Sequence, residues 1–289
     1  MDLSSSTSGV PTDDLPRLPY NLREHKLSIF LYWTAIFAES FMLPISLYYG
    51  LSNGTDMRPG AYFAIITAVF GFVTGFEYAM RGWRLVMKDD TYRPLNGSKR
   101  FWNFDSVMFI LQGPYFVMTA VMIGVSIPEP PKTRGLAVIL PIGMVIVATE
   151  MVASGIMHWR KMRIPYRLSS HVAGSVCPPL TFCIFEDIVA CDGRGGKVFR
   201  EAAMARYNAS PMYRKMLVQL NWAWAISAYA VAGAVFAVVA TIPQEIGYGL
   251  GWGIPCLWGI LGAIATTFFV KRSVKREREL WNGEKRAAA

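Results

Sequence analysis

The chain has 289 residues, of which 53% are hydrophobic and only 17% are charged, and its formal net charge is +9. Ordinary soluble domains carry about 25% charged residues, and the apolar residues of this chain fall into long unbroken runs instead of short periodic ones. A soluble fold would have to bury all of these runs within 32.3 kDa. The composition therefore excludes an ordinary soluble domain and indicates an integral membrane protein.

The chain begins with a polar tail, residues 1–26, which we predict to be disordered and cytosolic. Residues 1–16 are rich in Ser and Thr, slightly acidic and without an apolar core, so they lack the form of a secretory signal peptide. We therefore expect the first membrane span to serve as its own insertion signal.

Six stretches reach the roughly 20 apolar residues that a helix needs to cross a bilayer. They are residues 27–49, 61–80, 106–127, 136–157, 218–242 and 247–270. We therefore predict an all-α integral membrane protein with one polytopic membrane domain, residues 27–273. A basic C-terminal tail, residues 274–289, follows this domain.

A seventh apolar stretch, residues 172–190, has nearly the length of a span, so the distribution of Lys and Arg is used to place it. If this segment crosses the bilayer, the two sides carry 13 and 16 basic residues, which is no bias. If it does not cross, 26 of the 29 basic residues lie on one side, and only Arg58, Lys132 and Arg134 lie on the other. The charge distribution therefore favours six spans.

The composition of this segment agrees with that placement. Pro178 and Pro179 would break a helix at mid-membrane, and Glu186 and Asp187 would each be costly inside a span. We predict that residues 172–190 form a re-entrant or interfacial element on the positively charged side, with seven transmembrane helices as the alternative. Both termini are then cytosolic, and the endoplasmic reticulum or another endomembrane is the expected location.

Four carboxyl groups at membrane depth are candidate catalytic residues, because a carboxyl there is costly and usually functional. They are Glu39, Glu77, Asp105 and Glu150. A protonated carboxyl in apolar surroundings can act as a general acid near neutral pH. Structural alternatives stay open: Glu77 could pair with Arg81 one turn later, and Asp105 could cap a helix. Glu39 and Glu150 could form hydrogen bonds between helices.

Aromatic side chains deep in the spans could line a cavity and stabilise a cationic intermediate. The deep aromatics are Phe72, Phe76, Tyr115, Phe116, Trp224 and Trp258, although packing or lipid contact would explain each of them singly. We take Trp224 and Trp258, together with Glu186 and Asp187 of the interfacial segment, as candidate substrate-binding residues.

The residues predict no metal site and no cofactor. The three histidines are scattered, and Cys177, Cys183 and Cys191 are not spaced like zinc ligands. No phosphate-binding loop or nucleophile elbow is present. Asn53 stands in an Asn-Gly-Thr glycosylation sequon on the side opposite the termini, but it lies too close to the first span for us to expect its use.

The most distinctive run combines Glu186, Asp187, Val189, Ala190, Asp192 and Gly193 with Arg206, Tyr207, Ala209, Ser210 and Pro211. It resembles a group of functionally obscure fungal polytopic membrane proteins that share a Glu-Asp-x-Val-Ala-x-Asp-Gly run and an Arg-Tyr-x-Ala-Ser-Pro segment. The stretches 75–83 and 247–258 also look like that group, so the resemblance covers most of the chain. Some members occur beside secondary-metabolite (isoprenoid-type) genes, and the resemblance implies a fungal origin and a topology more than an activity.

Two classes of function follow from these residues. One is an intramembrane enzyme, similar in format to small fungal terpene cyclases, in which carboxyl groups protonate a lipophilic isoprenoid substrate. The other is a non-catalytic accessory membrane protein of a biosynthetic pathway, or a small transporter. The expected partners are the lipid bilayer, a lipophilic small molecule and pathway enzymes, with no nucleic acid. Convergence of the four acids on one cavity would favour the enzyme.

Overall fold

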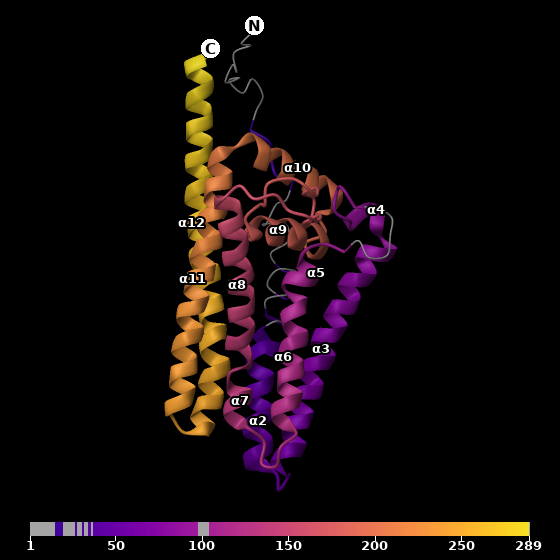
Figure 1. Ribbon diagram of the computed structural model, residues 1–289, viewed down its shortest axis with the longest axis vertical. Coiled ribbons are helices and arrows are strands. Elements are labelled where there is room, and N and C mark those ends of the chain that lie inside the picture. Colours follow the sequence, from indigo (N-terminus) through magenta and orange to yellow (C-terminus); the bar gives the residue numbers. More distant parts are fainter. Residues whose placement is uncertain are drawn as a thin grey trace.

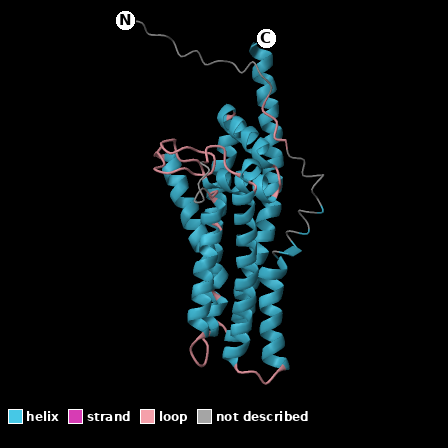
Figure 2. Ribbon diagram, turned by 90° about the vertical axis from the view of Figure 1, so that its right-hand side faces the viewer, coloured by secondary structure: helices cyan, strands magenta, loops and turns pink. Residues whose placement is uncertain are grey.

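The computed structural model describes residues 15–19, 27, 31, 34–35, 37–97 and 104–288, without the side chains of residues 89–90 and 284–288. This part of the chain is helical and contains two isolated β-bridges but no strand. Long helices run side by side along the longest axis of the molecule, and short helices and loops cover one end (Figures 1 and 2). We call this covered end the head.

The elements follow one another in a simple order. They are η1 (Ala38–Met42), α2 (Leu43–Gly54), α3 (Pro59–Met87), α4 (Asp89–Tyr92), α5 (Val107–Ile110), α6 (Gln112–Ser126), α7 (Thr133–Ala137), α8 (Ile139–Trp159), α9 (Leu180–Asp187), η2 (Ile188–Asp192), α10 (Gly196–Ala209), α11 (Pro211–Thr241) and α12 (Gln244–Ala288). The elements labelled η are π-helical turns. The head contains α4, α9, η2 and α10.

Five helical stretches among the described residues are long and apolar enough to cross a membrane. They are Pro59–Met87, Val107–Ser126, Ile139–Trp159, Pro211–Thr241 and Gln244–Gly283. The prediction of a helical chain with several helices of membrane length and composition is therefore confirmed. The first predicted span, residues 27–49, lies partly outside the described residues, and its described part runs through η1 into α2.

Three of the helices extend beyond the apolar runs from which they were predicted. Helix α3 continues to Met87, α11 begins at Pro211, and α12 continues to Ala288, so residues 274–288 are helix and not a separate tail. Charged residues end a membrane span but not a helix, because Lys, Arg and Glu are good helix formers. Ser210 Oγ marks the start of α11 by accepting a hydrogen bond from the Tyr213 amide at 3.1 Å.

Helix α12 and the described residues 15–19 both contact the head. The buried Arg206 of α10 forms an ion pair with Glu277 of α12, and its Nη1 donates to the Pro16 carbonyl at 3.5 Å. Helix α12 therefore reaches from the far end of the bundle past the head, a length of about 68 Å at 1.5 Å per residue.

An aromatic core fills the end of the bundle opposite the head. Tyr48 stacks on Tyr248 with ring centroids 4.1 Å apart, and Phe63 lies 5.6 Å from Tyr48. At the same end Arg134 donates to the carbonyls of Val239 at 2.8 Å and Ile242 at 3.1 Å. This guanidinium satisfies carbonyls that the end of α11 leaves without helical partners. One of the three basic residues on this side thus has a structural role.

The predicted interfacial segment, residues 172–190, consists of two different structures. Its first part is the second arm of a hairpin, which the bridge Arg163↔Val176 joins to the first arm and which turns at the bridge Leu168↔His171. Its second part is α9, only eight residues long, followed directly by η2. Pro179 separates the two parts, because its extended backbone (φ −62°, ψ 136°) stands just before the first turn of α9.

Candidate functional site

A cavity of about 830 Å³ lies between the helices of the bundle and extends toward the head, and its exposed lining residues Ile260 and Ile264 leave it open on one side. The described residues around it come from residues 34–40, from Leu111 between α5 and α6, and from α6, α8, α9, α11 and α12. They are mostly aliphatic and aromatic, and their polar groups are hydroxyls, one thiol and indole N–H groups. No carboxylate, imidazole or cationic side chain belongs to this described lining. Its volume and composition are those of a pocket for an apolar small molecule.

A pair of tryptophans forms one wall of the cavity. Trp224 of α11 and Trp258 of α12 meet edge to face, with ring centroids 5.0 Å apart. The Trp224 indole donates to Thr266 Oγ1 at 3.0 Å, and its ring packs against Gly262, where a Cβ would come within 2.7 Å of the ring. The Trp224 ring is therefore fixed, which gives the cavity a preorganised aromatic face.

Helix α9 covers the head end of the cavity through Thr181 and Ile184. The first amides of a helix have no partners within it, and here two buried side chains accept from them. Ser154 Oγ of α8 accepts from the Leu180 amide at 3.2 Å, and Asn221 Oδ1 of α11 accepts from the Thr181 amide at 3.3 Å. Asn221 also donates to the Met151 carbonyl at 2.8 Å. These bonds attach the short helix to two membrane helices.

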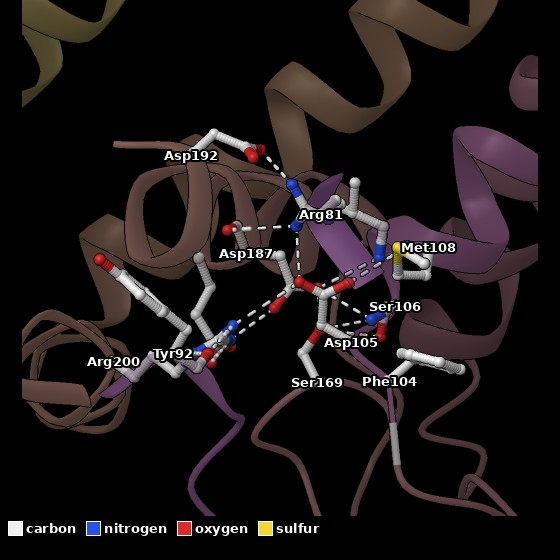
Figure 3. A network of polar contacts seen from close by, with 12 residues as sticks. Arg81, Tyr92, Phe104, Asp105, Ser106, Met108, Ser169, Asp187, Asp192 and Arg200 are labelled. Atoms are coloured by element: carbon white, nitrogen blue, oxygen red, sulfur yellow. Dashed lines mark hydrogen bonds and ion pairs between the residues drawn. The ribbon is translucent and has the colours of Figure 1, made fainter. Parts of the chain in front are cut away.

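A buried cluster of acidic and basic side chains lies at the other end of α9 (Figure 3). We call it the ion cluster, and its members are Arg81, Asp105, Glu186, Asp187, Asp192 and Arg200. They come from α3, the segment before α5, α9, η2 and α10. Asp105, Glu186, Asp187 and Arg200 have no exposed surface. The cluster therefore joins the head to the bundle mainly through groups that have no contact with solvent.

Each arginine of the ion cluster contacts several carboxylates. Arg81 Nη2 lies 2.5 Å from Asp105 Oδ2, and Arg81 Nη1 pairs with Asp192. Arg200 Nη1 lies 2.8 Å from Glu186 Oε1 and 2.5 Å from Asp187 Oδ1. Buried charges are tolerated only with such close pairing. Four carboxyl groups share two buried guanidinium groups, and the partly exposed Arg84 adds a longer contact of 3.7 Å to Asp192.

The carboxylates of the ion cluster also cap α5. Asp187 Oδ2 accepts from the Ser106 amide at 2.9 Å and the Val107 amide at 3.2 Å, while Asp105 Oδ1 accepts from the Met108 amide at 3.2 Å. The expected capping role of Asp105 is therefore seen, together with its ion pair. Ser169 donates to the same Asp187 oxygen from a left-handed backbone conformation (φ 49°).

Burial, and next the charge of Asp187, raise the pKa of Glu186 to about 7 and that of Asp105 to about 6. The folded protein then holds these protons more tightly than the unfolded chain, whose carboxyl pKa values lie near 4. Their contribution to stability is present at low pH and is lost as the pH rises through 6 to 7. His171 acts in the opposite direction, because burial lowers its pKa to about 4.

A comparison of wild type with Glu186→Gln removes one acid of the ion cluster and leaves His171 the same in both proteins. We expect the free energy of unfolding of the variant to rise relative to wild type by about 2 kcal/mol between pH 5 and pH 8. Denaturant unfolding of the detergent-solubilised protein measures it. The exposed Glu201 supplies the control, Glu201→Gln. A difference between Glu186→Gln and wild type that stays constant with pH would contradict the prediction.

The four acids singled out from the sequence do not meet at the cavity. Asp105 belongs to the ion cluster, and Glu39, on the π-helical turn η1, accepts from Thr74 Oγ1 at 3.1 Å. Glu150 of α8 has a buried carboxylate oxygen without a hydrogen-bond partner. The pairing considered for Glu77 and Arg81 is replaced by the pairs of Arg81 with Asp105 and Asp192.

The other predicted residues divide between the two parts of the site. Trp224 and Trp258 line the cavity, whereas Glu186 and Asp187 lie in the ion cluster. Three of the deep aromatics, Phe72, Phe76 and Phe116, are exposed on the outside of the bundle and do not line the cavity. Asn53 is exposed in the last turn of α2, where glycosylation stays a prediction.

Sequence reasoning missed Arg81 and Arg200 as site residues and Ser154 and Asn221 as supports of α9. A signal existed for Asn221, which is a polar residue inside an apolar run, and for Asp192, which belongs to the Glu-Asp-x-Val-Ala-x-Asp-Gly run. Within the described part of the chain, no group of three or more His, Cys, Asp or Glu residues is placed to hold a metal ion.

Neither the curated proteins nor the solved structures contain a significant match to the chain. A family model described as "Domain of unknown function (DUF8766)" matches residues 1–281, nearly the whole sequence. The chain therefore belongs to this family of unknown function, DUF8766.

Proposed function

We propose that the protein is a multi-pass membrane protein that binds a lipophilic small molecule in the bundle cavity. The observation that carries the proposal is the cavity itself, about 830 Å³ in volume, with the fixed Trp224 and Trp258 rings on one wall. An isoprenoid-type hydrocarbon with one polar end suits this lining, since a few hydroxyls, such as those of Ser40 and Thr181, can bind the polar group.

The arrangement of the acids supports binding without catalysis. A cyclase-like enzyme needs a proton donor in contact with its substrate, and none of Glu39, Glu77, Asp105 and Glu150 is among the described lining residues. We therefore favour a non-catalytic membrane component that holds a lipophilic compound for the enzymes of a biosynthetic pathway. The Trp pair then serves as a binding surface for the ligand and does not stabilise a carbocation.

We further propose six spans, with the head and both termini on the cytosolic side of an endomembrane. The distribution of basic residues supports this orientation, since 26 of 29 then lie on the head side. The eight residues of α9 support a non-crossing element, because a crossing helix needs about 20. Glycosylation mapping with acceptor sites engineered into the connection between α11 and α12 and into the head tests the orientation.

The binding proposal is tested with a photoreactive analogue of farnesol, a C15 isoprenoid alcohol, added to the purified protein. We expect saturable labelling of α11 and α12, which farnesol itself should prevent. Gly259 lines the cavity and a Cβ there meets nothing within 4 Å, so Gly259→Phe places a ring in the cavity without a backbone clash. We expect this variant to lose affinity for the probe about tenfold. Quantitative mass spectrometry of the labelled peptides measures both effects.

The matched control is Gly233→Phe. Gly233 is an exposed glycine of α11 with nothing within 4 Å of its Cβ position, and it does not line the cavity. This variant should label like wild type, because it adds the same ring on the outside of the bundle. Equal labelling of the Gly259→Phe variant, or labelling that farnesol does not reduce, would show that the cavity is not the binding site.

A further inference from the structure

A rigid hairpin connects α8 to α9 at the head end of the bundle. We call residues 159–177 the basic hairpin. Its two arms are joined by hydrogen bonds from the Ile164 amide to the Ser175 carbonyl at 3.0 Å and from the Cys177 amide to the Met162 carbonyl at 2.9 Å. Within the hairpin, the side chains of Ile164 and Cys177 are buried. His158 Nδ1 lies 2.7 Å from the Cys177 carbonyl and holds the second arm against α8.

The outer surface of the basic hairpin combines large apolar groups with positive charge. Its exposed apolar side chains are Trp159, Met162, Tyr166, Val172 and Val176. Arg160, Lys161 and Arg163 are exposed among them, and residues 159–177 contain no Asp or Glu. The fourth basic residue, Arg167, points inward and donates to the Phe104 carbonyl at 2.7 Å.

Lys161 stands in a backbone conformation that favours glycine. Its φ is 54°, and the Met162 amide next to it donates to the Met157 carbonyl at 2.9 Å, which closes the end of α8. This arrangement is a Schellman motif, whose left-handed position is usually glycine because a Cβ is unfavourable there. A glycine would fit this backbone with less strain, so Lys161 costs stability at this position.

We propose that the basic hairpin binds the headgroups of anionic phospholipids in the membrane that the protein spans. Helix α8 is of membrane length and ends at Trp159, so the hairpin begins where a bilayer would end. Trp and Tyr side chains at that level sit among headgroups, and three cations without an acid among them match negatively charged lipids. The outer surface of the basic hairpin therefore offers both apolar side chains and positive charge, which together suit a membrane surface. A soluble acidic partner would leave the apolar side chains without contacts.

The proposal is tested in nanodiscs of phosphatidylcholine, alone or mixed with phosphatidylserine. Native mass spectrometry counts the phosphatidylserine molecules that stay on the protein, and titration of this lipid in detergent gives an affinity. The variant R160Q/K161Q/R163Q should bind phosphatidylserine on the order of 100-fold more weakly, about fivefold for each charge removed. The control K275Q/R276Q/R278Q removes three exposed charges from the end of α12 and should bind like wild type.

Lys161→Gly separates lipid binding from folding. It should raise the unfolding temperature in phosphatidylcholine, because glycine relieves the left-handed backbone, and at the same time weaken phosphatidylserine binding about fivefold. Unchanged phosphatidylserine affinity in K161G, or an equal loss of affinity in the α12 control, would overturn the proposal. Complete competition by inorganic phosphate would also overturn it, because the site would then recognise a free anion and not a lipid surface.

Discussion

Replacement of Arg200 by methionine is expected to lower the free energy of unfolding by about 3–5 kcal/mol. Arg200 has no exposed surface and pairs with Glu186 at 2.8 Å and Asp187 at 2.5 Å, and its Nη2 lies 3.7 Å from Asp105. Its removal would leave the buried Glu186 and Asp187 without the guanidinium that pairs with both of them. Denaturant unfolding of the protein in detergent micelles, or loss of folded protein on expression, measures the effect.

Two further variants show whether charge or packing causes this loss. Lys197→Met removes a charge from an exposed position on the same helix, α10, and should change stability little. The triple variant R200M/E186Q/D187N removes the buried cation together with two of its carboxylates and should regain part of the lost stability. If the triple variant is no more stable than R200M alone, the ion cluster is not stabilised by charge pairing.

Gly251→Ala is the second substitution with a large expected effect. A Cβ at Gly251 of α12 would overlap the Ala137 carbonyl oxygen and come within 2.7 Å of its carbonyl carbon, both of which are backbone atoms at the end of α7. No side-chain rotation can relieve this overlap, so α12 has to move away from α7. We expect a loss of at least about 3 kcal/mol, the upper end of ordinary overpacking. Thermal and denaturant unfolding in detergent measure it.

The control for this substitution is Gly233→Ala in α11. Both positions lie inside long membrane helices, but the new methyl group at Gly233 meets nothing within 4 Å. Alanine there should stabilise the helix slightly, by about 0.5–1 kcal/mol. Opposite signs for the two Gly→Ala substitutions would show that close approach of α12 and α7 causes the effect. A Gly251→Ala variant as stable as wild type would contradict the described packing.

The membrane class and most helix positions could be predicted because both depend on local composition. The ends of the helices could not, because hydropathy reports where the bilayer ends and not where the helix ends. Residues 274–288 are the clearest case: their composition predicted a basic tail, yet α12 continues through them. There the ion pair of Glu277 with the buried Arg206, distant in the sequence, holds the helix to the head.

The partners of Arg81 could not be predicted either, because they are distant in the chain. Glu77 was the nearest candidate, but an i, i+4 pair on a helix contributes only about 0.2–0.5 kcal/mol. Asp105 and Asp192 are 24 and 111 residues away, and they compete successfully because their pairs with Arg81 form in a buried site. No spacing rule covers contacts of this kind.

The sequence also could not separate cavity-lining aromatics from lipid-facing ones. Trp224 and Trp258 line the cavity, whereas Phe72 and Phe76 face outward with 74% and 58% of their surface exposed. In a soluble protein the outward face would be polar and would reveal the difference. In a bilayer both faces are apolar, because lipid tails are as apolar as the interior of the bundle.

The ion cluster also imposes an order on biosynthesis. Arg81 and Asp105 leave the ribosome first and can pair as soon as the first helices meet. Glu186 and Asp187 follow, but the Arg200 guanidinium that neutralises them becomes available only when α10 has been made. Chains fold from the N-terminus during synthesis. Helix α9, which covers the head end of the cavity, therefore cannot form its ion pairs with Arg200 until about two-thirds of the protein has been made. The attachment of α9 over the head end of the cavity is therefore a late event in the folding of the nascent chain.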